Sequence, residues 1–156
     1  MAEAFNWDDA DNAVEPELIG VDAEGNFQSV EAQFKVNGVP EVVGSDDPNK
    51  RNIWLEILCE AIDYPNSPTV VHRLFIPNKE IQKAKTYNTF LLRIKRFRES
   101  LGWTPETPAV LGAQYPDLEN AVFNAKVGLE KGKDGFDDKN QLSRFQAAYI
   151  LICQPS

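Results

Sequence analysis

Residues 51–76 decide the fold of this chain, and they read RNIWLEILCEAIDYPNSPTVVHRLFI. Residues 51–62 and 69–76 are apolar runs rich in the branched and aromatic side chains that favour strands. Between them stands the turn sequence 64–68, Tyr-Pro-Asn-Ser-Pro, whose prolines and small polar residues favour a turn. Because the connection is short, the sequence predicts two neighbouring strands that pair antiparallel.

Successive side chains of a strand point to opposite faces, so residues 51–62 divide into two sets. One face carries Ile53, Leu55, Ile57 and Cys59, and the other carries Trp54, Glu56, Leu58 and Glu60. The apolar surroundings of Cys59 predict a buried, reduced thiol. The pattern leaves open whether Trp54, and Phe75 in the second strand, belong to the core or to the surface.

Three further strands are predicted outside this pair. Residues 27–36 alternate as a half-buried strand, and residues 37–50, which hold two Gly and two Pro, form a loop. Residues 121–130 alternate in the same way, residues 131–138 form a Gly- and Asp-containing hairpin loop, and residues 139–149 form the fifth strand.

One helix interrupts the strands, because the apolar period changes after residue 88. Its apolar face carries Phe90, Leu91, Ile94, Phe97 and Leu101, spaced as on one side of a helix. Asn88 is the predicted N-cap and Gly102 the predicted C-cap. Residues 103–118 then form a long connection.

The order of elements is therefore three strands, a helix and two strands. This order predicts a mainly β fold, a five-stranded OB-fold-like barrel with one helix between strands 3 and 4. We expect residues 25–156 to form this single domain, because a chain of 156 residues suits one core.

Residues 1–24 carry eight acidic residues and no Lys or Arg, which equals the formal net charge of −8 of the whole chain. Residues 25–156 hold 16 acidic and 16 basic residues. The chain is therefore a neutral body with an acidic, largely disordered arm. Two aromatic residues in the arm, next to two aspartates, indicate either a docking segment for a protein partner or packing onto the body: Phe5, Trp7, Asp8 and Asp9.

Basic residues are concentrated between Lys79 and Arg98, where seven Lys or Arg accompany one acid, Glu80. This run is either a solvated helix face or a track for a phosphate backbone. The predicted strands and the 131–138 loop add further cations and aromatic rings. A cationic groove with exposed rings suits single-stranded nucleic acid, because bases stack on the rings. The candidate nucleic-acid-binding residues are Arg51, Trp54, Arg73, Phe75, Lys85, Tyr87, Arg93, Lys126, Lys131, Lys133 and Arg144.

The sequence offers little support for an enzyme. His72 is the only histidine and lies within a predicted strand, where we expect a packed or surface strand residue and not a general base. No Cys and His spacing matches a zinc site, and no glycine-rich phosphate loop is present. The pairs Asp46-Asp47 and Asp137-Asp138 fit solvated loops better than a metal-dependent nuclease. No cofactor or metal is expected, and the absence of a membrane-length apolar run or a signal sequence predicts a cytoplasmic protein.

Several stretches together resemble a family of small tailed-phage proteins, long catalogued as a domain of unknown function. They are the opening Phe5-Asn6-Trp7-Asp8-Asp9, the Gly25-Asn26-Phe27 segment, the Phe90 to Trp103 helix with its Ser-Leu-Gly end, and the Ala125-Lys126-Val127 strand before a charged hairpin. The resemblance implies an OB-fold and binding of single-stranded DNA in phage replication or recombination, inside a bacterial host. It also implies that the acidic arm recruits replication or recombination proteins and competes with DNA.

The expectation is therefore a non-enzymatic protein that binds single-stranded DNA with little sequence preference. The alternative is a protein-interaction or adaptor protein that acts through the acidic arm. A homo-oligomer is left open, because Leu58, Ile62 and residues 147–152 either form an interface or complete the core.

Overall fold

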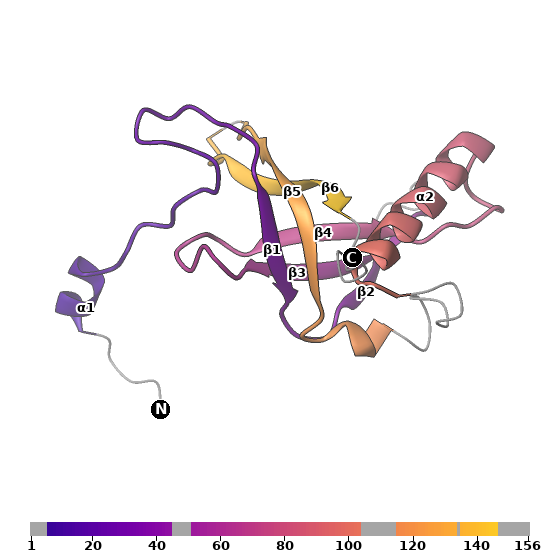
Figure 1. The fold of residues 1–156 in the computed structure, drawn as a ribbon, viewed down its shortest axis with the longest axis horizontal. Helices are drawn as coiled ribbons and strands as arrows, with labels where there is room; N and C mark the ends of the chain where they lie inside the picture. The colour runs from indigo at the N-terminus through magenta and orange to yellow at the C-terminus, as the bar shows by residue number, and fades with distance from the viewer. Residues whose placement is uncertain (1–5, 45–50, 104–114, 134, 147–156) are drawn as a thin grey trace, which may run out of the picture.

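The computed structural model describes residues 6–44, 51–103, 115–133 and 135–146, with the side chains of 115 and 116 excepted (Figure 1). Phe5, Asp46-Asp47, Cys153 and the apolar C-terminal run lie outside these ranges. Among the helices of the described residues, none has the length and apolar character needed to cross a membrane.

Antiparallel strands form a single sheet in the order β2-β3-β1-β5-β6, with β4 paired to β3 (Figure 1). β3 is the organising strand, because β1 and β2 pair with its two halves and β4 pairs along its length. The strand bounds are β1 Glu31–Val36, β2 Glu41–Gly44, β3 Ile53–Ala61, β4 Val70–Phe75, β5 Val122–Glu130 and β6 Lys139–Gln146.

The mainly β prediction is confirmed, and so is the antiparallel pairing of β3 with β4. Six strands replace the expected five, because β2 lies within the expected 37–50 loop. The four residues of β2, next to Pro40, are too few to show a strand pattern in the sequence. The strand forms because it pairs with the N-terminal half of β3. The helix therefore follows the fourth strand. The sheet is not closed, since no pairing joins β4 to β6 in the described ranges.

The core lies between the strands, where the predicted alternation is confirmed except at Ile53, which is 40% exposed at the start of β3. In β3, Leu55, Ile57 and Cys59 are buried, while Trp54 and Glu56 on the other face are half-buried. Burial raises the pKa of the Cys59 thiol to about 12, so the free thiol stays protonated. The other strands contribute the buried side chains of Ala32, Phe34, Val36, Val70, Leu74, Phe123, Ala125 and Val127.

Helix α2, Ala84–Ser100, packs against β4, β5 and β6. Its Phe97 is fully buried and meets Phe123 edge-on at 5.4 Å between ring centres. The predicted N-cap at Asn88 is wrong, because the helix begins one turn earlier, after Lys83. The C-cap is Leu101, one residue before the predicted one, and Gly102 follows it with φ +76°, a left-handed conformation that glycine adopts without strain.

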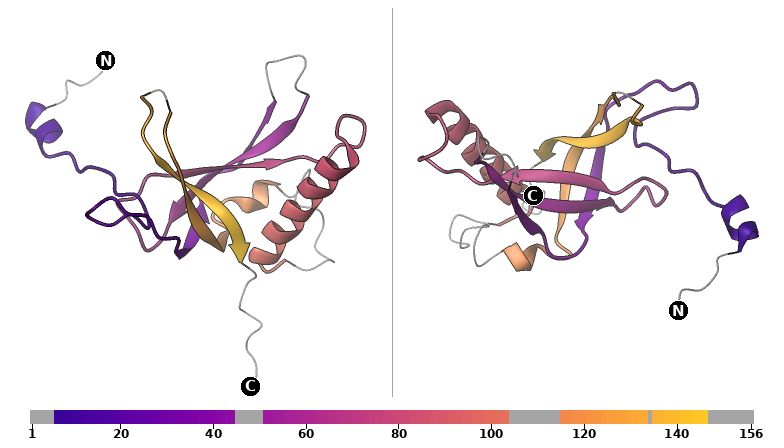
Figure 2. Two further views of the ribbon diagram at one scale, coloured as in Figure 1. Left: turned by 90° about the horizontal axis from the view of Figure 1, so that it is seen from above. Right: turned by 180° about the vertical axis from the view of Figure 1, so that it is seen from behind.

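The N-terminal arm has two parts with different environments. Helix α1, Trp7–Asp11, stands away from the sheet in all three views (Figures 1 and 2). By contrast, Ile19 is buried, and its backbone N–H and C=O bond to the Asn140 side-chain amide at 2.7 and 3.0 Å. Packing onto the body therefore starts ahead of the expected boundary at residue 25. The acidic composition of residues 1–24 favoured a disordered segment, and the packing of the apolar Ile19 side chain was therefore not predicted.

Candidate nucleic-acid interface

The outer face of β3 and β4 carries a cluster of two aromatic rings and one cation. Trp54 and Phe75 are partners in the strand register, and their ring centres lie 5.5 Å apart. The guanidinium of Arg73 lies 5.1 Å from the Trp54 ring centre, within the range of a cation–π interaction. These three predicted site residues therefore form one unit, which we call the Trp54 cluster.

Trp54 and Phe75 belong neither fully to the core nor fully to the surface, because both residues are half-buried. Phe75 stacks on Phe90 of α2 with ring centres 5.0 Å apart and planes inclined by 12°. That contact joins the helix to the outer face of the sheet. Trp54 is half-buried with no ring stacked flat on it in the described structure, and its indole Nε1 is buried without a hydrogen-bond partner there. Trp54 is therefore the better stacking candidate, while Phe75 supports it from behind.

Acidic residues lie beside the Trp54 cluster. This proximity was not predicted from the sequence. Glu56 forms an ion pair with Arg73 at 3.8 Å, and Glu41 is the register partner of Glu56 on β2. Both side chains of the ion pair keep substantial exposure, so solvent screens the attraction. The two carboxylates lower the local positive potential. Cations that could bind a phosphate backbone would therefore have to lie next to this face.

Those cations are available at the start of α2. Gln82 donates from Nε2 to the Asn52 side-chain oxygen at 3.0 Å, which brings the residues before the helix to the start of β3. Lys79 lies over the Tyr87 ring with its Nζ 5.6 Å from the ring centre. We define the basic shoulder as the exposed cations in these two segments: Arg51, Lys79, Lys83 and Lys85.

Two predicted residues lie on a different part of the sheet. Lys126 on β5 and Arg144 on β6 are register partners, and both are exposed. Glu31 on β1 is the other register partner of Lys126. Register neighbours share a face of the sheet, so these cations sit with a carboxylate on the outer face of β1, β5 and β6. Neither is a register neighbour of any member of the Trp54 cluster.

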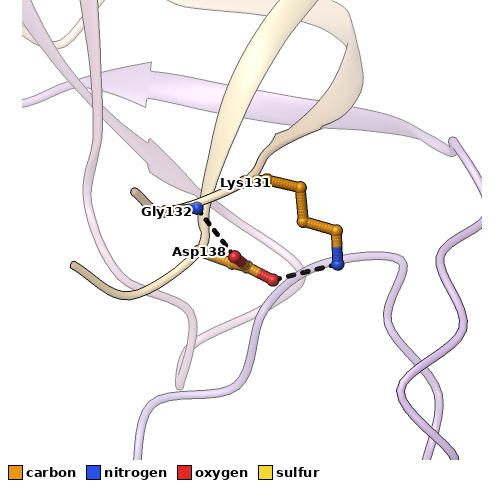
Figure 3. Close-up of polar contacts among 3 residues, drawn as sticks. All are labelled: Lys131, Gly132 and Asp138. Atoms are coloured by element: carbon orange, nitrogen blue, oxygen red, sulfur yellow. Dashed lines mark hydrogen bonds and ion pairs between the residues drawn. The ribbon is translucent and has the colours of Figure 1, made fainter. Parts of the chain in front are cut away.

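The β5–β6 hairpin loop holds Lys131 and Lys133, and its shape depends on Asp138 (Figure 3). The Asp138 carboxylate accepts from the Gly132 backbone N–H at 2.8 Å and from Lys131 Nζ at 3.2 Å. These bonds lower the pKa of Asp138, the backbone bond most. Because Lys131 is paired, Lys133 is the better phosphate contact. The sequence prediction omitted Phe136 from the site, although its ring is 79% exposed and its place in a hairpin loop was a signal.

Arg93 lies at the groove between β4 and β6, which Arg73 and Lys139 also line. His72 also lines this groove and meets Phe145 edge-on at 5.0 Å. Burial, together with a smaller effect of the positive charge of Arg93, lowers the pKa of His72 to about 4. The imidazole is therefore neutral near pH 7. Of the two positions expected for His72, packed or on the surface, the structure shows the packed one, in edge-on contact with Phe145.

The structure thus brings together part of the predicted site. Arg51, Lys85 and Tyr87 lie at the end of α2 nearest to β3, beside the Trp54 cluster. The remaining cations are placed on the β5–β6 hairpin and in the β4–β6 groove. Of the predicted partner-binding residues, Trp7, Asp8 and Asp9 are all exposed on α1.

The described part of the chain contains no group of three or more His, Cys, Asp or Glu side chains placed to hold a metal ion. Comparison with known proteins found no protein-family model that matches this chain and no curated protein that is similar to it.

Proposed function

We propose that this protein binds single-stranded DNA on the outer face of β3 and β4. The observation that carries the proposal is the Trp54 cluster, a half-buried ring with a cation over it beside the basic shoulder. A base can stack on the free part of the Trp54 ring, while the shoulder cations contact phosphates. Stacking needs only the π-face that every base has, so binding has little sequence preference.

We also propose that the open sheet is a variant of the OB-fold. In this interpretation β1 and β2 together act as one bent first strand, because both pair with the same edge of β3. β3 and β4 then correspond to the second and third strands, and α2 precedes the final β5–β6 hairpin. OB-folds bind oligonucleotides on the face of their second and third strands, which is the face of the Trp54 cluster.

The resemblance to the phage family supports a role in replication or recombination. Binding alone performs that role: cations capture the backbone, stacking holds bases apart, and the strand stays available to a polymerase or recombinase. No catalytic step is part of the proposal.

The adaptor function is a second candidate, and α1 favours it. The helix stands clear of the sheet, and Trp7 is 73% exposed beside Asp8 and Asp9 (Figures 1 and 2). An exposed ring next to carboxylates suits a segment that docks on another protein. The two functions are compatible, because α1 and the Trp54 cluster lie on different parts of the chain.

Ultraviolet cross-linking to oligo-dT, followed by mass spectrometry, tests the proposed surface. We expect adducts on peptides that contain Trp54 and Tyr87, and loss of those adducts when unlabelled oligo-dT is added in excess. Adducts confined to the β1–β5–β6 face would place the binding surface elsewhere. The absence of any adduct would leave the adaptor function as the better proposal.

A further inference from the structure

A groove separates β4 from β6, and each of these strands has one edge without a partner strand in the described residues. Its volume is about 490 Å³, and both strands line it. Contacts between the two strands are through side chains, such as His72 with Phe145. Unpaired strand edges are sites where an extended segment can add.

The β4 edge presents backbone hydrogen-bonding groups to this groove. The Ile76 N–H donates to the Ile53 carbonyl at 2.9 Å, which fixes the phase of the β3–β4 ladder. Hydrogen-bonded pairs alternate with non-bonded pairs along antiparallel strands. The backbone N–H and C=O groups of Leu74 and His72 therefore also point toward β3. Val71 and Arg73 therefore direct their N–H and C=O groups toward the groove.

The groove also holds an unsatisfied polar group and a cation. His72 is largely buried, and its Nε2 has no hydrogen-bond partner in the described structure. A buried polar atom without a partner is costly, which favours a ligand that supplies one. Arg93 has no ion pair among the described residues, whereas Lys139 is paired with Glu130 at 3.7 Å. A carboxylate is the ligand that satisfies both the free guanidinium and a buried imidazole N–H.

The acidic arm leaves the body at one end of this groove. Glu17 N–H donates to the Asn66 carbonyl at 3.0 Å, in the turn just before β4. Ile19 is held by Asn140, which itself lines the groove. The arm is therefore anchored to both walls. Ten extended residues reach about 33 Å, and the six residues of β4 span about 20 Å, so residues 7–16 can follow the whole groove.

We propose that the acidic arm of this chain, residues 7–16, docks in the groove between β4 and β6. In the docked form, Asp11 or Glu15 places a carboxylate at Arg93 and His72, and the arm backbone pairs with the free β4 edge. The tether gives the arm a millimolar effective concentration, so weak contacts suffice. The arm then exchanges between this docked form and the detached form seen in Figure 2. The inference rests on the groove and not on DNA binding.

Paramagnetic relaxation in the full chain tests this proposal. A nitroxide is attached at Ala10→Cys in a chain that also carries Cys153→Ser, and Cys59 stays unlabelled because it is buried. We expect strong broadening of the Leu142 and Ser143 amides and of the His72 ring, the single histidine of the chain. The double variant Asp11→Asn, Glu15→Gln should lose at least half of this broadening, and so should Arg93→Gln.

Two controls test whether the broadening depends on residues 7–16 and whether it arises within one chain. Asp22→Asn removes an acidic charge outside residues 7–16 and should leave the broadening unchanged. In a second sample, nitroxide-labelled protein is mixed with isotope-labelled protein that carries no nitroxide. Broadening in the mixed sample as strong as in the first sample would show that the arm docks on a second copy and would overturn the proposal. Absence of broadening in the single-chain sample would overturn it as well.

Discussion

The Arg73 guanidinium lies over the Trp54 ring at 5.1 Å, while Glu56 holds the same guanidinium at 3.8 Å. The tryptophan thus has one part of its surface covered by a cation that is itself only loosely held. In the proposed DNA complex, a base that stacks on Trp54 would either displace Arg73 or lie beside it. In the proposed complex, Arg73 would then be available to contact a neighbouring phosphate.

Trp54→Ala should weaken binding to oligo-dT about 5- to 150-fold, since stacking of one base is worth about 1–3 kcal/mol. Val71→Ala removes an exposed apolar side chain from the same face and should change the affinity less than twofold. Fluorescence anisotropy of a labelled oligonucleotide measures both variants. Equal losses in the two variants would show that Trp54 has no specific stacking role.

Phe97→Ala should lower the free energy of unfolding by about 3–5 kcal/mol, because the fully buried ring leaves a cavity among the core aromatic residues. Leu91, which the sequence predicts on the same apolar face, is instead 42% exposed, and Leu91→Ala should cost less than about 1 kcal/mol. Urea denaturation followed by circular dichroism compares the two. A cost for Leu91→Ala as large as that for Phe97→Ala would contradict the assigned helix face.

Asn140→Ala should release the segment around Ile19, whose N–H and C=O both bond to the Asn140 amide. Leaving these buried groups unpaired should cost about 1–3 kcal/mol of unfolding free energy. Hydrogen exchange should show faster exchange of the Ile19 amide, with the β3 amides still protected. Ser143→Ala, which removes an exposed hydroxyl bond on the same strand, is the matched control. Unchanged Ile19 exchange in Asn140→Ala would contradict the anchor.

His72 makes stability depend on pH in a known direction. Its pKa is lowered to about 4 in the folded protein, chiefly by burial, from 6.5 in the unfolded chain. Below pH 6.5 the unfolded chain takes up a proton that the folded chain refuses, so stability falls as the pH drops from 6.5 toward 4. Between pH 7 and pH 5 the loss should be about 2 kcal/mol.

Denaturation midpoints of the natural chain and of His72→Gln, measured at both pH values, check this effect. The variant lacks the titrating ring, so its stability should fall by about 2 kcal/mol less over the same range. Parallel pH dependence in the two chains would mean that His72 titrates normally in the folded state.

The sequence predicts the main strands because their period is strong where one face is buried. Leu55, Ile57 and Cys59 alternate with more polar neighbours, and β3 forms where they predict it. β2 could not be predicted, because its four residues contain no such alternation and pair only where β3 offers an edge. The start of α2 was misplaced for a related reason: Lys83 makes no side-chain cap bond, so no local signal marks it.

The candidate site is predictable residue by residue but not as an arrangement. The sequence predicts that Trp54, Arg73 and Phe75 share a face, because the antiparallel pairing of two neighbouring strands and the alternation of their side chains can be read from it. The separation of Lys126 and Arg144 from them depends on which strands neighbour which, and that is set by tertiary pairing. The same holds for Glu41, which reaches the site only through β2.

The central claim is that single-stranded DNA binds to the outer face of β3 and β4. Anisotropy titration of labelled oligo-dT and of a matched duplex, over a series of salt concentrations, tests it most directly. We predict binding to the single strand that weakens as salt rises, much weaker binding to the duplex, and a smaller salt dependence in Lys85→Gln. No binding to the single strand at low salt, with the acidic residues of the arm neutralised as well, would contradict the claim.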